Sequence, residues 1–244
     1  MLLYTKPSLL TDTDMHYCPG CSHAVVNKII AEVLEEMNIG TENIIGVSPV
    51  GCGVFIYNYI DIDWVEAAHG RAPAVATGVK RMNPDKLVFT YQGDGEITAI
   101  GTGEVIHACN RGENIAIIFI NNAVFGMTNG QMAPTTPLGM KTTTCPDGRD
   151  PQLNGYPLPM AQLFADIQGT CYVTRQAVNT YKAVKNTKKA IRRAFDYSLQ
   201  RKGTSVVEII CACPTNWKMT PVEANKYISD FSVKTFPLGD LKRP

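Results

Sequence analysis

The stretch FTYQGDGEITAIGTGEVIHACNRGENIAIIFINNAVFG, residues 89–126, decides the fold class of this chain. Two apolar runs, KLVFTYQ and NIAIIFI, are rich in β-branched and aromatic residues and are bounded by turn residues, which is typical of buried parallel strands. Between them Ile97, Ile100, Val105 and Ala108 recur at helical spacing. The order is strand, glycine-rich turn, helix and strand, which predicts a right-handed crossover between two parallel strands.

The segments on either side continue this alternation of helix and strand. HAVVNKIIAEVLEEMNI, residues 23–39, has helical spacing, and CYVTRQAV and TSVVEIICAC have the composition of strands that flank another helix. Residues 127–159 are dense in Pro, Gly and Thr, and loops this long usually have a function. We expect a single domain over residues 1–244, a doubly wound α/β fold with a mainly parallel sheet, a short N-terminal arm and a C-terminal tail.

The composition argues against several classes of partner. The chain has 244 residues, 45% of them apolar, and a formal net charge of +1, so electrostatics favour neither nucleic acid nor a membrane as the main partner. The sequence contains no targeting pattern and no window of 18 uncharged apolar residues, so we expect a cytoplasmic protein. Eight cysteines are many for a compartment that keeps thiols reduced, which favours metal or redox chemistry over disulfides.

Polar residues follow both central strands at their carboxyl ends, where ligands bind in an open parallel sheet. Gly93 and Gly95 let the backbone approach a ligand closely, and the N–H groups of the following helix favour phosphate there. A carboxylate at Asp94 would repel that phosphate unless a cation lay between them. Mg²⁺ also takes neutral oxygens, which the Asn122 side chain and the Val124 carbonyl can supply. The pattern predicts a Mg²⁺-diphosphate site, although Gly-Asp-Gly and Asn-Asn are also common turn sequences.

Four of the cysteines lie in motifs that suit a metal or an iron–sulfur cluster: Cys18 and Cys21 in CPGC, Cys52 in GCG, and Cys213 before a proline. A structural zinc site is the alternative. Cys211 competes with Cys213, which we prefer because it lies at the turn after the strand. Cys109 and Cys171 suit buried free thiols within a helix and a strand. Cys145, in the long loop, has no evident role.

Gly-Asp-Gly and Asn-Asn, separated by one helix and one strand, resemble the signature of the thiamine diphosphate enzymes. From Tyr17 to Glu223 the chain is similar to a β subunit of the 2-oxoacid:ferredoxin oxidoreductases. The motifs that carry this resemblance are CPGCSH, GCG, HGRAPAVATGVKRMNPD, YQGDGE, NNAVFGMTNGQMAPTT and CPTNW. The resemblance implies the thiamine diphosphate-binding fold, with Asp94, Asn122 and the Val124 carbonyl holding Mg²⁺ and the cofactor diphosphate.

The same resemblance implies a 4Fe-4S cluster close to the thiamine cofactor, held by Cys18, Cys21, Cys52 and Cys213. We expect further cofactor contacts at Gly51, Cys52, His69, Gly70, Gly93, Gly95 and Glu96. His69, in the motif HGR, is the catalytic candidate near the thiazolium ring, and a packed structural histidine is the alternative. Arg71 in the same motif is a weaker candidate.

The activity implied by the resemblance is oxidative decarboxylation of a 2-oxoacid to acyl-CoA and CO2. Electrons would leave one at a time through the cluster to ferredoxin or a ferredoxin-like subunit. An α subunit would supply the other half of the thiamine site. Phe55 stands where family members acting on pyruvate or 2-oxoglutarate often have a basic residue, which favours a branched-chain substrate such as 2-oxoisovalerate; alternatively, Phe55 packs against the sheet.

Two other interpretations remain open. A non-oxidative thiamine diphosphate decarboxylase or synthase subunit with a structural zinc site would keep both polar motifs but has no use for four spaced cysteines. A non-catalytic, zinc-stabilised subunit that holds a nucleotide would keep the cysteines without needing thiamine.

Overall fold

The structure, a computed structural model, describes residues 5–244 of the chain. Its centre is a seven-stranded sheet with the strand order β2-β1-β3-β4-β8-β7-β9. Neighbouring strands run parallel except β7 and β9. The strands are β1 (Ile44–Ser48), β2 (Asp63–Glu66), β3 (Leu87–Gly93), β4 (Ala116–Asn121), β7 (Thr170–Ala177), β8 (Thr204–Ile210) and β9 (Gly239–Lys242). The predicted doubly wound, mainly parallel α/β fold is confirmed.

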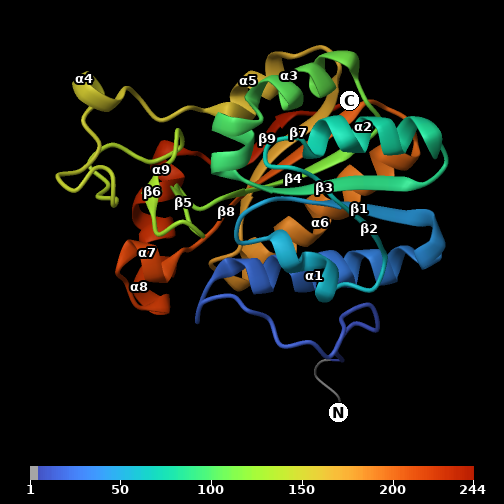
Figure 1. The fold of residues 1–244 in the computed structure, drawn as a ribbon, viewed down its shortest axis with the longest axis horizontal. Helices are drawn as coiled ribbons and strands as arrows, with labels where there is room; N and C mark the ends of the chain where they lie inside the picture. The colour runs from blue at the N-terminus through green and yellow to red at the C-terminus, as the bar shows by residue number, and fades with distance from the viewer. Residues whose placement is uncertain (1–4) are drawn as a thin grey trace.

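Helices cover both faces of the sheet (Figure 1). One face packs on α1 (Ser22–Met37) and α6 (Tyr181–Leu199), and the other on α2 (Ala72–Met82), α3 (Thr102–Arg111) and α5 (Met160–Asp166). Strand β4 shows how the pleat divides the core: Ile118 and Ile120 face α1 and α6, whereas Ile117 and Phe119 face the opposite layer. Burial on both faces explains why this strand is a continuous apolar run.

The predicted crossover is present between β3 and β4, which pair in parallel. The helix between them begins differently from the expectation, because a π-helical turn, Glu96–Ile100, precedes α3. There the Gly101 N–H bonds to the carbonyl of Glu96, five residues earlier, at 2.7 Å. Such turns inside helices are frequent at functional sites, and this one lies directly after the Gly-Asp-Gly motif.

A small lobe covers the carboxyl edge of the sheet, beyond the ends of β4 and β8 (Figure 1). It contains β5 (Val124–Phe125), β6 (Gln131–Met132), α4 (Pro151–Asn154), α7 (Pro214–Trp217), α8 (Pro221–Tyr227) and α9 (Val233–Thr235). It has its own apolar cluster, which includes Val124, Met140, Trp217, Ile228 and Phe236. This lobe brings the long loop after β4 next to the segment after β8.

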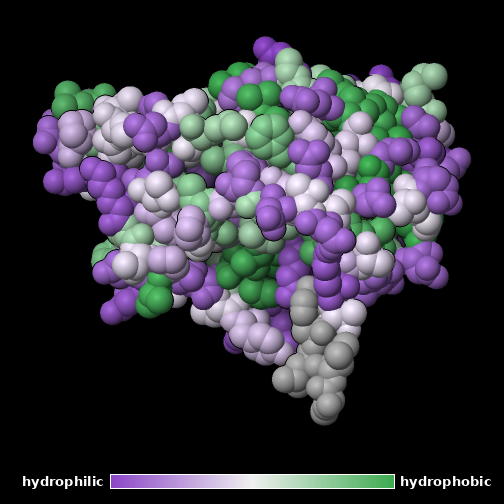
Figure 2. Space-filling model, turned by 60° about the horizontal axis from the view of Figure 1, so that its bottom comes forward, coloured by the Kyte–Doolittle hydropathy of each residue, from purple (hydrophilic) through white to green (hydrophobic). Residues whose placement is uncertain are grey.

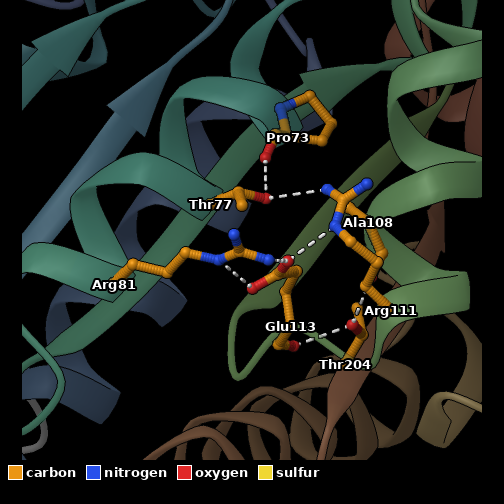
Figure 3. A network of polar contacts seen from close by, with 7 residues as sticks. All are labelled: Pro73, Thr77, Arg81, Ala108, Arg111, Glu113 and Thr204. Atoms are coloured by element: carbon orange, nitrogen blue, oxygen red, sulfur yellow. Dashed lines mark hydrogen bonds and ion pairs between the residues drawn. The ribbon is translucent and has the colours of Figure 1, made fainter.

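The opposite edge of the sheet is held by an ionic network around Glu113, just before β4 (Figure 3). Its carboxylate accepts hydrogen bonds from Arg81 of α2 at 2.6 Å and from Arg111 of α3 at 2.7 Å. Burial alone would raise the pKa of Glu113, but these two arginines hold it below its ordinary value. The Thr204 hydroxyl of β8 donates to the Glu113 carbonyl at 2.7 Å. The network fixes α2 and α3 against the sheet, far from the carboxyl edge.

The surface is mixed in character (Figure 2). In that view, hydrophobic residues gather in a patch near the centre of the face, within a largely hydrophilic surround. Within residues 5–244, no helix has the length and apolar character needed to cross a membrane.

Candidate functional site

A cavity at the carboxyl edge of the sheet collects nearly all the residues that the sequence predicted as cofactor contacts. Its lining includes Gly51, Cys52, His69, Gly93, Asp94, Gly95, Glu96, Asn122 and Val124, together with His23 and residues 125–128. Gly70 does not line it, but its N–H donates to a lining carboxylate. The segments after β1, β3 and β4 meet here because neighbouring parallel strands end at one edge.

Asp94 lies at the floor of this cavity with its side chain almost fully buried. One carboxylate oxygen accepts the Gly95 N–H at 2.9 Å, and the other accepts the Thr135 hydroxyl at 2.6 Å. Burial raises the pKa of Asp94 to about 7, against the lowering effect of these hydrogen bonds. Both donors are neutral, so a divalent cation would supply the positive charge that this buried carboxylate calls for.

The Asn-Asn motif forms a tight turn at the end of β4. Ala123 has a positive φ of 65°, a conformation that is costly for alanine and has to be held by its surroundings. Asn121 holds it, because its side-chain oxygen accepts the Ala123 N–H at 3.2 Å while its amide donates to buried Glu208 at 2.7 Å. Asn122 accepts the Val124 N–H at 3.2 Å on its side-chain oxygen. That oxygen keeps a second lone pair, so it can still ligate a cation.

His69 and Glu96 face each other across the cavity wall. The His69 Nδ1 lies 3.7 Å from one oxygen of Glu96, and that oxygen accepts the Gly70 N–H at 2.9 Å. Within the described chain, His69 Nδ1 and the second Glu96 oxygen are buried without a hydrogen-bond partner. Unpaired buried polar atoms are rare and point to an interaction with a bound group. Arg71 instead forms an ion pair with Glu104 at the surface and does not line the cavity.

The four motif cysteines lie next to the cavity. Cys21 precedes the first residue of α1, where Ser22 and Ala212 exchange hydrogen bonds and so bring the start of α1 beside Cys213. Burial raises the pKa of Cys21 to about 11, and the neighbouring Cys213 and Cys18 thiols add to this shift. Cys52 behaves alike: burial raises its pKa to about 12, with further contributions from the other three thiols. The sulfurs are therefore mutual neighbours.

The arrangement of these cysteines bears on the zinc alternative. In residues 5–244, no three or more His, Cys, Asp or Glu side chains are grouped so that they could hold one metal ion. A structural zinc site needs four ligands about 2.0–2.3 Å from a single ion. The all-sulfur donor set and its wider spacing fit a larger, thiolate-ligated centre better than a single zinc ion.

The other four cysteines are buried. Cys109 of α3 and Cys171 of β7 lie in the cores on the two sides of the sheet. Cys211 packs in the α1 and α6 layer, whereas Cys213 belongs to the small lobe. The two therefore do not point the same way, contrary to the expectation from strand alternation, because β8 ends at Ile210 and the chain turns after it. Cys145 lies in the long loop, its thiol 3.3 Å from the Asn154 side-chain oxygen.

The long loop supplies a site residue that the sequence did not single out. Thr135, fully buried, is the donor to Asp94. The loop is organised by buried Arg149, whose guanidinium donates to six backbone carbonyls, those of Ala133, Pro134, Thr136, Asn154, Gly155 and Tyr156. The Thr135 signal was visible in the motif MAPTT, but only the folded loop places that hydroxyl on a carboxylate 41 positions away.

Comparison with known proteins identifies the family. The family model described as thiamine pyrophosphate enzyme, C-terminal TPP binding domain, matches residues 50–209. The 2-oxoglutarate synthase subunit KorB of Methanocaldococcus jannaschii is 34% identical over 232 residues, covering 92% of this chain and 81% of that protein. The chain belongs to the thiamine diphosphate-binding subunits of the 2-oxoacid oxidoreductases. The predicted family and the predicted thiamine diphosphate cofactor are thereby confirmed.

Further relatives of this oxidoreductase subunit differ in length. The ketoisovalerate oxidoreductase subunit VorA of Methanothermobacter thermautotrophicus is 44% identical over 230 residues, which are 94% of this chain but 48% of that protein. The chain thus spans about half the length of the VorA relatives. A solved 2-oxoglutarate:ferredoxin oxidoreductase from Magnetococcus marinus matches with a TM-score of 0.82 at 22% identity, covering 100% of this chain and 86% of that one. At this identity the match establishes the shared fold.

Proposed function

We propose that this chain is the β subunit of an enzyme that oxidatively decarboxylates a 2-oxoacid to an acyl-CoA and CO2 and passes the electrons to ferredoxin. The observation that carries this proposal is the adjacency of two centres. The cavity built around Asp94 and Asn122 shares Cys52 in its lining with the group of four cysteines. A non-oxidative thiamine enzyme has no use for thiolates at that distance.

In this proposal Mg²⁺ is held by the Asp94 carboxylate, the Asn122 side-chain oxygen and the Val124 carbonyl. Thr135 and the Gly95 N–H keep the Asp94 carboxylate oriented. The backbone of Gly93, Gly95 and Gly51 lines the cofactor side of the cavity. Thiamine diphosphate, when bound, supplies the carbanion that attacks the keto carbon of the substrate and the electron sink for decarboxylation.

The remaining lining residues orient the reacting groups. We assign His69 as the residue near the thiazolium ring, and Glu96 as the carboxylate that faces it at 3.7 Å. Their unpaired buried atoms give them free hydrogen-bonding capacity toward a bound cofactor and substrate. The 4Fe-4S cluster is assigned to Cys18, Cys21, Cys52 and Cys213, whose thiolates are the ligands such a cluster requires.

A branched-chain 2-oxoacid is the proposed substrate. Phe55 is 38% exposed and makes an edge contact with the His16 ring at a centroid distance of 5.1 Å. It therefore does not pack against the sheet, and in the described chain it lies outside the cavity lining. A hydrophobic residue exposed beside the site suits an apolar substrate, as the name of the ketoisovalerate relative also suggests. An α subunit is proposed to complete the site, and residues 1–244 are proposed to form one domain.

The test is to purify the chain anaerobically together with its partner subunits. Iron, sulfide and zinc are measured on the same sample, and ferredoxin reduction is assayed with coenzyme A and either 2-oxoisovalerate or 2-oxoglutarate. A brown protein with about four irons per chain that prefers 2-oxoisovalerate supports the whole proposal. A preference for 2-oxoglutarate overturns the substrate assignment alone. A colourless protein with zinc overturns the oxidoreductase proposal and favours the non-oxidative alternative.

A further inference from the structure

The short helix α7 (Pro214–Trp217) lies between the two centres of the site. It starts directly after Cys213, and its last two side chains reach back to the segment after β4. Trp217 donates from its indole nitrogen to the Asn122 carbonyl at 3.0 Å. Asn216 donates from its side-chain amide to the Gly126 carbonyl at 2.9 Å. One turn of helix thus contacts both the cysteine group and the cavity.

Asn216 also contacts the cysteine group itself. Its side-chain nitrogen lies 3.3 Å from the Cys213 sulfur, and its backbone N–H bonds to the same sulfur. The amide has two N–H groups, so it can donate to the sulfur and to Gly126 at once. Both neighbours are acceptors when the thiol is deprotonated, so the nitrogen, and not the oxygen, has to face them.

Close packing holds this side chain in place. A Cβ atom added at Gly130, which has a positive φ of 81°, would come 3.0 Å from the Asn216 side chain. A Cβ atom added at Gly126 would come 3.0 Å from the Cys52 sulfur. The segment 126–130 therefore fits against Asn216 on one side and against a second motif cysteine on the other. The amide has little room for another orientation.

We propose that Asn216 is a positioning residue that couples the two centres: its amide donates one hydrogen bond to the Cys213 sulfur and one to the Gly126 carbonyl. This inference rests on the proposed function, because it takes Cys213 to be a cluster ligand. Hydrogen bonds to ligand sulfurs stabilise the reduced cluster, which carries more negative charge, and so raise its potential. The bond to Gly126 fixes the segment that lines the thiamine cavity.

The experiment compares three variants of the assembled enzyme, purified anaerobically with its partner subunits. Asn216→Leu keeps the approximate size and removes both donors, and Asn216→Asp replaces the donating nitrogen by an oxygen. Asn225→Leu is the matched control, because Asn225 is also half-buried but lies on α8. The midpoint potential of the cluster is measured by redox titration followed by electron paramagnetic resonance, and thiamine diphosphate affinity by equilibrium dialysis.

We expect Asn216→Leu to shift the midpoint potential to a more negative value and Asn216→Asp to shift it further. Thiamine diphosphate affinity should fall about fivefold in Asn216→Leu, as one lost hydrogen bond predicts. Asn225→Leu should match the wild type in both. If Asn216→Leu does not fold, Asn216→Asp decides. Wild-type potentials in the Asn216 variants overturn this inference alone, whereas a wild-type enzyme without an iron–sulfur signal overturns the proposed function as well.

Discussion

Replacing Glu208 by glutamine is expected to destabilise the fold strongly. Glu208 lies on β8 with 1% of its side chain exposed, and it accepts hydrogen bonds from Arg175 Nε at 2.6 Å and from Asn121 at 2.7 Å. Arg175 is fully buried, and its other nitrogens bond to the Gln162 side chain and the Pro237 carbonyl. Glutamine keeps the shape and an acceptor oxygen, so the substitution removes mainly the negative charge that balances Arg175.

The magnitude follows from burial. Breaking a buried ion pair by neutralising one partner costs about 3–5 kcal/mol, because a charge is left without compensation in the interior. The retained oxygen places the expected loss at about 3 kcal/mol. For a chain of 244 residues this corresponds to a fall in Tm of roughly 6–12 °C. The Asn121 turn loses its support from a charged acceptor, so cofactor affinity should fall together with stability.

The assay is thermal and urea unfolding followed by circular dichroism, with Glu113→Gln as the matched control. Glu113 also pairs with two arginines, but their side chains are 61% and 42% exposed (Figure 3). Water can solvate those arginines after the substitution, so the control should lose only about 1 kcal/mol or less. If Glu208→Gln is no less stable than Glu113→Gln, the argument that burial determines the cost of losing the carboxylate is refuted.

Three further outcomes are expected. Thr135→Val removes the hydroxyl that donates to Asp94 and should weaken Mg²⁺ binding about tenfold, since hydrogen bonds to charged groups contribute about 1.5–3 kcal/mol; Thr135→Ser should restore it, and unchanged Mg²⁺ titrations of both would refute the role. Because burial raises the pKa of Asp94 to about 7, Mg²⁺ must displace a proton below that pH, so its affinity should fall about tenfold per pH unit in calorimetric titrations. In the metal-free chain the same raised pKa means that the folded state binds more protons than the unfolded state between pH 4 and 7, so unfolding experiments should show its contribution to stability declining as the pH rises through that range. Cys52→Ser should lower the iron content of the purified enzyme while Cys109→Ser, in the core of α3, leaves it unchanged; equal iron in both would contradict the ligand assignment.

Much of the fold and the location of the site could be predicted from local sequence. Continuous apolar runs such as Ala116–Ile120 indicate strands buried on both faces, and their burial requires helices on both sides of the sheet. Parallel strands end at one edge, so the polar residues after β3 and β4 had to lie together. That argument needed only strand direction, and the structure places Asp94 and Asn122 in one cavity as expected.

The partners of those residues could not be predicted, because they come from distant segments and depend on how loops and the ends of elements pack. Thr135 reaches Asp94 only because Arg149 gathers the loop carbonyls around its guanidinium. The different directions of Cys211 and Cys213 follow from the end of β8, which residue alternation does not reveal.

The sequence by itself therefore determined the α/β class, the edge of the sheet at which the site lies, and the chemical groups present there. Periodicity and strand direction are local properties, and they are sufficient for those conclusions. Only the tertiary structure decided which groups support one another: Glu208 behind Asn121, and Asn216 between Cys213 and Gly126. Those hydrogen bonds join residues 3 to 90 positions apart, and their formation depends on the packing of the small lobe against the sheet.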